Sequence, residues 1–300
     1  MSSSRRILTT HAGSLPRPAE LARLHGLRSR GEPVDPDELR GEVEVATAAV
    51  MQAQVDVGID IGNDGEQARE SFFTYVQHRM SGFGGVSRRP LMADLKAHGD
   101  FTELSAARGE RAKVNLRRAP AAIGAVDYIS TAEVEAECAL VAESPFADTF
   151  MTSASPGIVA AAMENQYYGS MDEYVRAVAA ALSQEYHSIA EHGLLLQIDG
   201  PDLALERHTS FAGRPLGDFI AWMELVIGCL NHALTGIDRE RIRLHVCWGN
   251  YEGPHTFDVA LDDTCRPSTR QTLAAWCSRW PTPATPMSSS VSPAAPCPTT

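Results

Sequence analysis

The sequence predicts an α/β protein of the TIM (β/α)₈ barrel type, incomplete because about six β/α units are present. Strand-like apolar runs alternate with helical segments over most of the 300 residues. Consecutive units of this kind form a parallel sheet with right-handed crossovers. Polar residues also gather where the strands end, which is where a barrel places its active site. A doubly wound open sheet is the alternative, but no Gly-rich phosphate loop follows any predicted strand.

The first two predicted strands cover residues 7–9 and 59–63, and a long helix lies between them. That helix begins where Asp35 is an N-cap and Pro36 occupies the first helical position, with an acid at the third. It is expected to run to about Val57, because a glycine follows.

The later units continue the alternation. The helix at residues 171–192 has the clearest pattern, since its apolar residues recur at helical spacing. The other predicted strands cover residues 121–126, 148–153, 194–199 and 241–247, and the other predicted helices cover residues 131–142 and 219–234, with one more opening at Pro156.

The composition is that of an ordinary globular protein with a sizeable core, at 44% hydrophobic and 21% charged residues. No apolar run approaches the length of a membrane span, and the N-terminus lacks the apolar region of a secretory signal, so we expect a cytoplasmic protein that does not bind membranes. The net charge of −12 argues against a nucleic-acid partner, whose phosphates demand a basic surface.

The composition changes abruptly at Asp263. All 38 acidic residues lie at or before it, whereas the remaining 37 positions hold seven of the 18 prolines in a Ser/Thr/Pro/Ala-rich background. This predicts a barrel-type domain over residues 1–263 and a disordered segment over residues 264–300. Arginine outnumbers lysine 24 to 2, which suggests GC-rich codons, so we interpret the segment as an out-of-frame translation that truncates the barrel. A natural disordered tail is the alternative.

His245 and Cys247 end the sixth predicted strand. Residues i and i+2 of a strand point to the same face, so the imidazole and the thiolate are able to converge on one ion. Nitrogen and sulfur ligands together suit Zn²⁺. Two ligands are fewer than zinc requires, and a His-x-Cys sequence by itself is more often a buried pair.

Acidic residues end two other predicted strands. Glu66 follows the second strand in the stretch Gly-Asn-Asp-Gly-Glu, whose glycines permit a tight turn that aims the carboxylate inward. A solvated acidic loop is the alternative. Asp199 ends the fifth strand, where it is either a helix N-cap or a carboxylate facing the barrel mouth.

Ala12, Gly13 and Ser14 follow the first predicted strand. Such small residues let backbone N–H groups approach an anion, although a plain turn explains them equally well. Together these groups suit an amino acid with a thiol side chain, such as homocysteine. Two acids can hold its ammonium group, backbone amides its carboxylate, and zinc its thiol.

Four sequence stretches resemble, in the same order, the catalytic barrel of cobalamin-independent methionine synthase. They are THAGSLPRP (10–18), NDGE (63–66), QID (197–199) and HVCWGN (245–250). The resemblance covers roughly residues 6–262 and is strongest to short single-domain relatives, including epoxyalkane:coenzyme M transferase-like proteins.

The resemblance implies a zinc-dependent S-methyltransferase. Such enzymes transfer a methyl group from 5-methyltetrahydrofolate, with its polyglutamate tail, to homocysteine and so produce methionine. It also implies that zinc is held by His245 and Cys247, the homocysteine amine by Glu66 and Asp199, and its carboxylate by the loop of Ala12, Gly13 and Ser14.

This sequence departs from the family pattern after about Asp262. The family's further zinc ligands, a glutamate and a second cysteine, and its proton-transferring histidine are not found here, which implies impaired activity. An alkyl transferase acting on coenzyme M is one alternative, but a sulfonate does not need Glu66 and Asp199. An inactive truncated remnant is another. A metal-free decarboxylase of the uroporphyrinogen type would leave His245 and Cys247 without a purpose.

Overall fold

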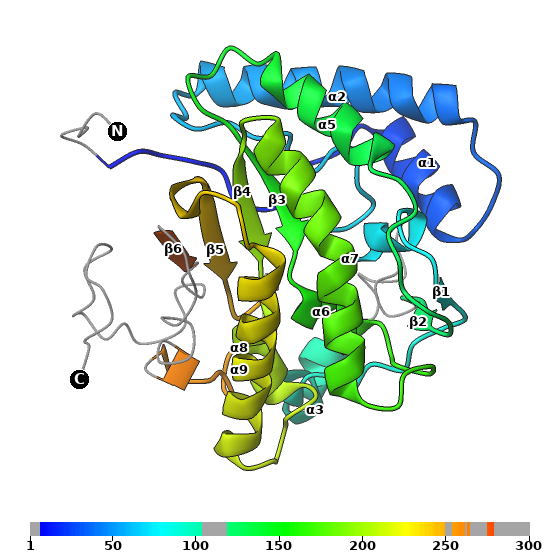
Figure 1. Cartoon of the computed structure of the whole chain (residues 1–300), viewed down its shortest axis with the longest axis vertical. Helices are drawn as coiled ribbons and strands as arrows, with labels where there is room; N and C mark the ends of the chain where they lie inside the picture. The colour runs from blue at the N-terminus through cyan, green and yellow to red at the C-terminus, as the bar shows by residue number, and fades with distance from the viewer. Residues whose placement is uncertain (1–6, 104–118, 250–253, 262, 265–274, 279–300) are drawn as a thin grey trace.

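The computed structural model describes residues 7–103, 119–249, 254–261, 263–264 and 275–278. Its main sheet contains four parallel strands in chain order (Figure 1). They are β3 (Phe150–Ala154), β4 (Leu195–Asp199), β5 (Ile242–Val246) and β6 (Ala275–Ser278). The predicted alternation of strands and helices is therefore confirmed.

Two isolated parallel bridges continue this order on the β3 side. Thr10 bridges to Ile61, and Gly62 bridges to Thr149, which immediately precedes β3. The stretches predicted as the first and second strands thus lie side by side ahead of β3. The sheet nevertheless stays open: a closed barrel is not formed by the residues that the structure describes.

The strand predicted at residues 121–126 is wrong as a member of the parallel sheet. Ala121–Ala122 (β2) pairs antiparallel with Phe83–Gly84 (β1) in a separate two-stranded sheet. Gly82, at φ 85°, lets the two backbones approach so closely that a Cβ there would collide with the carbonyl of Ala125. The backbone hydrogen bonds of the 121–126 stretch go to Gly82 and to the segment around Asn165, and not to the main sheet.

The long helices match their predicted positions. Asp35 caps α2 (Pro36–Asp56) by accepting a hydrogen bond of 2.9 Å from the amide of Asp37. In α7 (Met171–Glu191) the periodic apolar residues after Met171 are buried, and the helix packs against β3, β4 and α9 (Leu216–Ala233). The helix α1 (Ala19–Ser29) is not predicted, because no side chain caps it.

Figure 1 labels four further helices, and the described residues also contain three 3₁₀ turns. They are α3 (Ala93–Ala97), α5 (Ala132–Ala142), α6 (Pro156–Ala162), α8 (Asp202–Leu205), and the 3₁₀ turns η1 (Thr74–His78), η3 (Glu206–His208) and η4 (Arg239–Arg241). No helix among the described residues is long and apolar enough to cross a membrane.

The strand β6 lies in the segment 264–300, for which the composition predicts a disordered tail. It pairs in parallel with β5, so these four residues form a strand. Most of that segment lies outside the described residues. The division of the chain at residue 263 therefore stays a prediction.

Candidate functional site

Two carboxylates meet at the carboxyl ends of the parallel strands. Glu66 follows the strand-like stretch that bridges to Thr149, and Asp199 is the last residue of β4. Both are buried, with 2% and 6% of their surfaces exposed. Burial raises the pKa of Glu66, and the nearby charge of Asp199 raises it further. Two acids that influence each other in this way share one site.

Burial also changes the acidity of Asp199. Burial raises its pKa to about 6, although Gln197 donates a hydrogen bond of 2.7 Å to its Oδ1 and the charge of Arg69 opposes the shift. A buried carboxylate with a raised pKa is typical of sites that bind a cation or exchange a proton.

The turn before Glu66 explains why this side chain points inward. Glu66 has φ 56°, a left-handed conformation that is uncommon for residues other than glycine and costs about 1–3 kcal/mol. Asn63 and Asp64 support the turn, since their side chains accept hydrogen bonds from the amides of Gly65 (2.7 Å) and Glu66 (3.0 Å). A solvated acidic loop is therefore the wrong interpretation of this stretch.

Replacing Gly65 with Ala is expected to displace this turn. Gly65 has φ 59°, and an added Cβ would lie 2.9 Å from the Cβ of Leu15. The backbone conformation alone costs about 1–2 kcal/mol for an L-residue, and the clash adds to that loss of stability. Gly31, at φ 72° with nothing within 4 Å of its Cβ position, is the matched control. Equal losses for Gly65→Ala and Gly31→Ala in urea denaturation would contradict the close packing described here.

The loop of Ala12, Gly13 and Ser14 lies against this turn. The amide of Leu15 donates to the carbonyl of Gly65 at 3.0 Å, and Ser14 Oγ donates a short hydrogen bond to Glu66 Oε2. Gly13 adopts φ 86°, and no atom lies within 4 Å of the position that a Cβ would occupy. The structure thus brings the predicted loop and Glu66 together and leaves room beside Gly13.

His245 lies on the strand next to Asp199. The two residues are register partners in the β4–β5 ladder, and the amide of Gly200 donates to the carbonyl of His245 at 2.9 Å. His245 is buried, while Cys247 follows the end of β5 and is half-buried. A histidine nitrogen and a cysteine sulfur are the kinds of ligand atom that zinc binds. Among the residues that the structure describes, no group of three possible metal ligands includes His245 or Cys247, so zinc at this pair stays a prediction.

Two arginines that sequence analysis missed support the site. Arg17 Nη2 donates to the backbone carbonyl of Glu66 at 2.8 Å, and the charge of the fully buried Arg69 opposes the rise that burial causes in the pKa of both site carboxylates. Arg69 itself donates to Glu137 Oε2 at 3.0 Å. Arg17 lies within the THAGSLPRP stretch and Arg69 only three residues after Glu66, so proximity to the motifs was the available signal.

Arg69 connects the site to a buried ionic network. Glu185 on α7 is fully buried and receives hydrogen bonds from Ser153 Oγ (2.6 Å), Tyr128 Oη (2.7 Å) and Arg79 Nη1 (3.0 Å). Burial alone would raise the pKa of Glu185, but the guanidinium groups of Arg79 and Arg69 hold it at about 2. This network holds Arg69 in place near the two site carboxylates.

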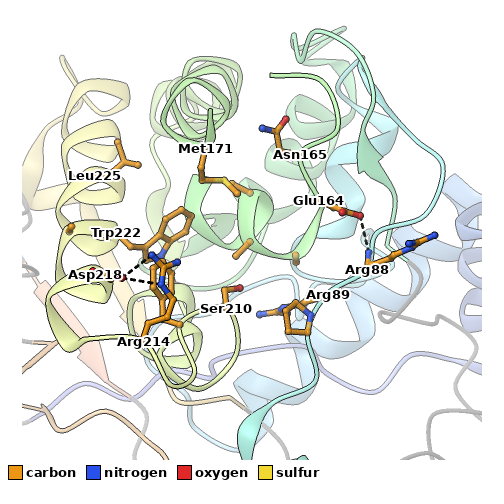
Figure 2. A pocket seen from close by; sticks show the side chains of 16 residues that line it. Arg88, Arg89, Glu164, Asn165, Met171, Ser210, Arg214, Asp218, Trp222 and Leu225 are labelled. Atoms are coloured by element: carbon orange, nitrogen blue, oxygen red, sulfur yellow. Dashed lines mark hydrogen bonds and ion pairs between the residues drawn. The ribbon is translucent and has the colours of Figure 1, made fainter. Parts of the chain in front are cut away.

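A cavity of about 600 Å³ lies between α6, α7 and α9 (Figure 2). Two arginine side chains that line it already pair with acids, Arg89 with Glu206 and Arg214 with Asp218, and the backbone amide of Arg88 donates to Glu164. None of the seven residues predicted for the candidate site lines this cavity. It is therefore separate from the strand-end site.

Comparison with known proteins points to one group, although no protein-family model matches the chain. Methionine synthase of Saccharolobus solfataricus is 24% identical over 258 residues, which cover 85% of this chain and 67% of the relative. That of Pyrococcus abyssi is 25% identical over 245 residues, covering 81% and 62%. A structure of a B12-independent methionine synthase from Shewanella sp. W3-18-1 in complex with selenomethionine has a TM-score of 0.58 at 22% identity, covering 82% of this chain and 63% of that one. The chain thus spans about two thirds or less of the length of these relatives.

Proposed function

The chain is a distant homologue of the cobalamin-independent methionine synthases, and from this premise we propose that its strand-end site binds homocysteine for methyl transfer. The methyl donor in this proposal is 5-methyltetrahydrofolate with a polyglutamate tail, and the product is methionine. In the reaction the sulfur forms a bond to the methyl carbon as the N5–methyl bond breaks. N5 keeps that electron pair and takes up a proton, while the thiol has lost one.

The observation that carries the proposal is the pair of buried acids. Glu66 and Asp199 lie close enough for their charges to interact, and neither forms an ion pair with a basic side chain in the part of the chain that the structure describes. A buried pair of carboxylates is costly unless a cation joins it. The ammonium group of an amino acid supplies that cation.

The other residues of the site have complementary roles in the proposal. Ser14 fixes the Glu66 carboxylate through its hydrogen bond, and the backbone beside Gly13 has space to receive the substrate carboxylate. His245 and Cys247 would hold zinc, which lowers the pKa of a bound thiol and keeps the sulfur nucleophilic near neutral pH.

The decisive assay follows the methyl group. The full chain with Zn²⁺ is incubated with homocysteine and 5-methyltetrahydropteroyltriglutamate that carries a CD₃ group, and labelled methionine is measured by mass spectrometry. Labelled methionine from the wild type, and its loss in Asp199→Asn but not in Asp172→Asn, is the expected result. Asp172 is the matched control because it is exposed on α7. Two outcomes would overturn the proposal. Labelled coenzyme M in a parallel reaction would favour an alkyl transferase for coenzyme M. The absence of any labelled thiol would favour an inactive remnant.

We expect zinc to bind weakly at His245 and Cys247. Two ligands supply much less binding free energy than the three or four of an ordinary zinc site. Titration with Co²⁺, which reports thiolate ligation by a charge-transfer absorption, is expected to saturate only at a large excess of metal. Saturation at one equivalent, abolished by His245→Ala but not by His192→Ala on the exposed end of α7, would show that the site is complete.

A further inference from the structure

We propose that Asp94, His208 and Asp258 form a second metal site, which takes a divalent cation with mixed nitrogen and oxygen ligands such as Mn²⁺ or Zn²⁺. Asp94 belongs to α3, His208 ends η3, and Asp258 lies in the segment 254–261. One ligand atom from each residue lies within 4.8 Å of the others. The three segments are distant in sequence, so the fold itself assembles this group.

The state of His208 is the independent sign of a ligand. Its side chain is 1% exposed, and neither ring nitrogen makes a hydrogen bond to any residue that the structure describes. Nδ1 lies 3.3 Å from Asp94 Oδ2 and Nε2 lies 3.7 Å from Asp258 Oδ1. Neither of these contacts has the geometry of a hydrogen bond. A buried imidazole in this condition is costly, and a metal ion bound to one ring nitrogen would satisfy that atom and leave the other nitrogen to carry the proton.

The two carboxylates are already oriented by neighbouring groups. Asp94 Oδ1 accepts a hydrogen bond of 2.8 Å from the amide of Thr256, and Asp258 Oδ2 lies 3.0 Å from His255 Nδ1. The opposite oxygens, Asp94 Oδ2 and Asp258 Oδ1, are those nearest to His208. Carboxylates that ligate metals are commonly held by hydrogen bonds in this manner.

The ligand chemistry selects the class of ion. One imidazole with two carboxylates offers no sulfur, so it does not favour soft metals, and the imidazole makes the site less suited to Mg²⁺ and Ca²⁺. Two carboxylate charges neutralise a divalent cation. Three protein ligands leave open positions for water or for a further ligand.

The site is also connected to the strand end that carries His245 and Cys247. Trp248, the residue after Cys247, donates a hydrogen bond of 2.9 Å from its indole nitrogen to the carbonyl of Val259, next to Asp258. Metal binding at Asp258 would therefore also restrain Val259 and, through this hydrogen bond, Trp248 after β5. This gives the ion a structural role beside the candidate site.

The test uses Mn²⁺ alone as the probe on the full chain after removal of metal with EDTA. Electron paramagnetic resonance of unbound Mn²⁺ gives the stoichiometry and affinity. We expect one ion per chain in the wild type and in Cys247→Ser, and an affinity lower by about tenfold or more in Asp258→Asn and His208→Gln. Asp238→Asn, at an exposed 3₁₀ cap, is the control for loss of one carboxylate.

A second measurement keeps the proposal testable if the buried variants do not fold. The melting temperature of Cys247→Ser should rise with added Mn²⁺, and Co²⁺ bound to this variant should show no thiolate charge-transfer absorption. Absence of Mn²⁺ binding in the wild type, or unchanged binding in folded Asp258→Asn, would overturn the proposal. In that case Asp94 and Asp258 flank His208 without binding a metal.

Discussion

Replacing Glu185 with Gln is expected to lower the free energy of unfolding by about 3–5 kcal/mol. The substitution keeps the size of the side chain but removes the charge that compensates the buried guanidinium of Arg79, 3.0 Å away, and of Arg69 behind it. Removing one partner of a buried ionic network leaves the other charges without compensation, and that is the main cost. Urea denaturation with an unchanged m-value measures it.

The control for this substitution lies on the same helix. Glu191 ends α7 and is exposed, so Glu191→Gln should change stability by no more than about 0.5 kcal/mol. A similar small effect for Glu185→Gln would mean that the network contributes little to folding.

The same residue predicts a dependence of stability on pH. The pKa of Glu185 is about 2 in the folded chain against 4.5 for an ordinary glutamate. Between these values the unfolded chain binds more protons, so the stabilisation is complete above about pH 4.5 and is lost as pH falls toward 2. Asp64 and Asp199, with pKa values raised to about 6, have the opposite effect between about pH 4 and 6. Comparing the wild type with Glu185→Gln isolates the contribution of Glu185.

Replacing Glu66 with Gln is expected to weaken homocysteine binding while it stabilises the fold. The loss of a buried charge that contacts the substrate ammonium corresponds to about 2–5 kcal/mol, or roughly a thirtyfold to several-thousandfold weaker affinity. The fold should gain about 0.5–2 kcal/mol near pH 8, because a buried carboxylate beside Asp199 is removed and the hydrogen bond from Ser14 has an acceptor in Gln.

Calorimetric titration and thermal unfolding of the same preparations measure both effects. Glu135, exposed on α5, provides the control, and Glu135→Gln should change neither property. A Glu66→Gln variant that binds homocysteine normally, or that is clearly destabilised, would identify Glu66 as a structural residue.

Local sequence signals predicted those elements whose stability is also local. The cap at Asp35 and the apolar spacing along α7 fixed two long helices to within one residue at each end. Glycines at turns and acids at strand ends made Glu66 and Asp199 candidates, because a strand end and a turn are recognisable without knowing the neighbouring strands. Their site roles came from the resemblance to the methionine synthases.

Features that depend on distant contacts were not predictable from the sequence. The stretch at residues 121–126 has the composition of a strand, but its partner is the glycine-rich stretch at Phe83–Gly84 and not the parallel sheet. Arg69 and Glu185 appear in sequence as ordinary solvated charges, and only the fold shows that they are buried together. His208 and Asp258 likewise carry no local motif, since their proximity results from the path of the chain.

Comparing two thiols tests whether the buried carboxylates of Glu66 and Asp199 hold an ammonium group. L-homocysteine and 4-mercaptobutanoate differ only in the amino group, so the ratio of their dissociation constants isolates its contribution. We expect the wild type to bind homocysteine more tightly by about 2 kcal/mol or more, and Asp199→Asn to lose most of that preference. Equal affinities of the wild type for the two thiols would contradict the account.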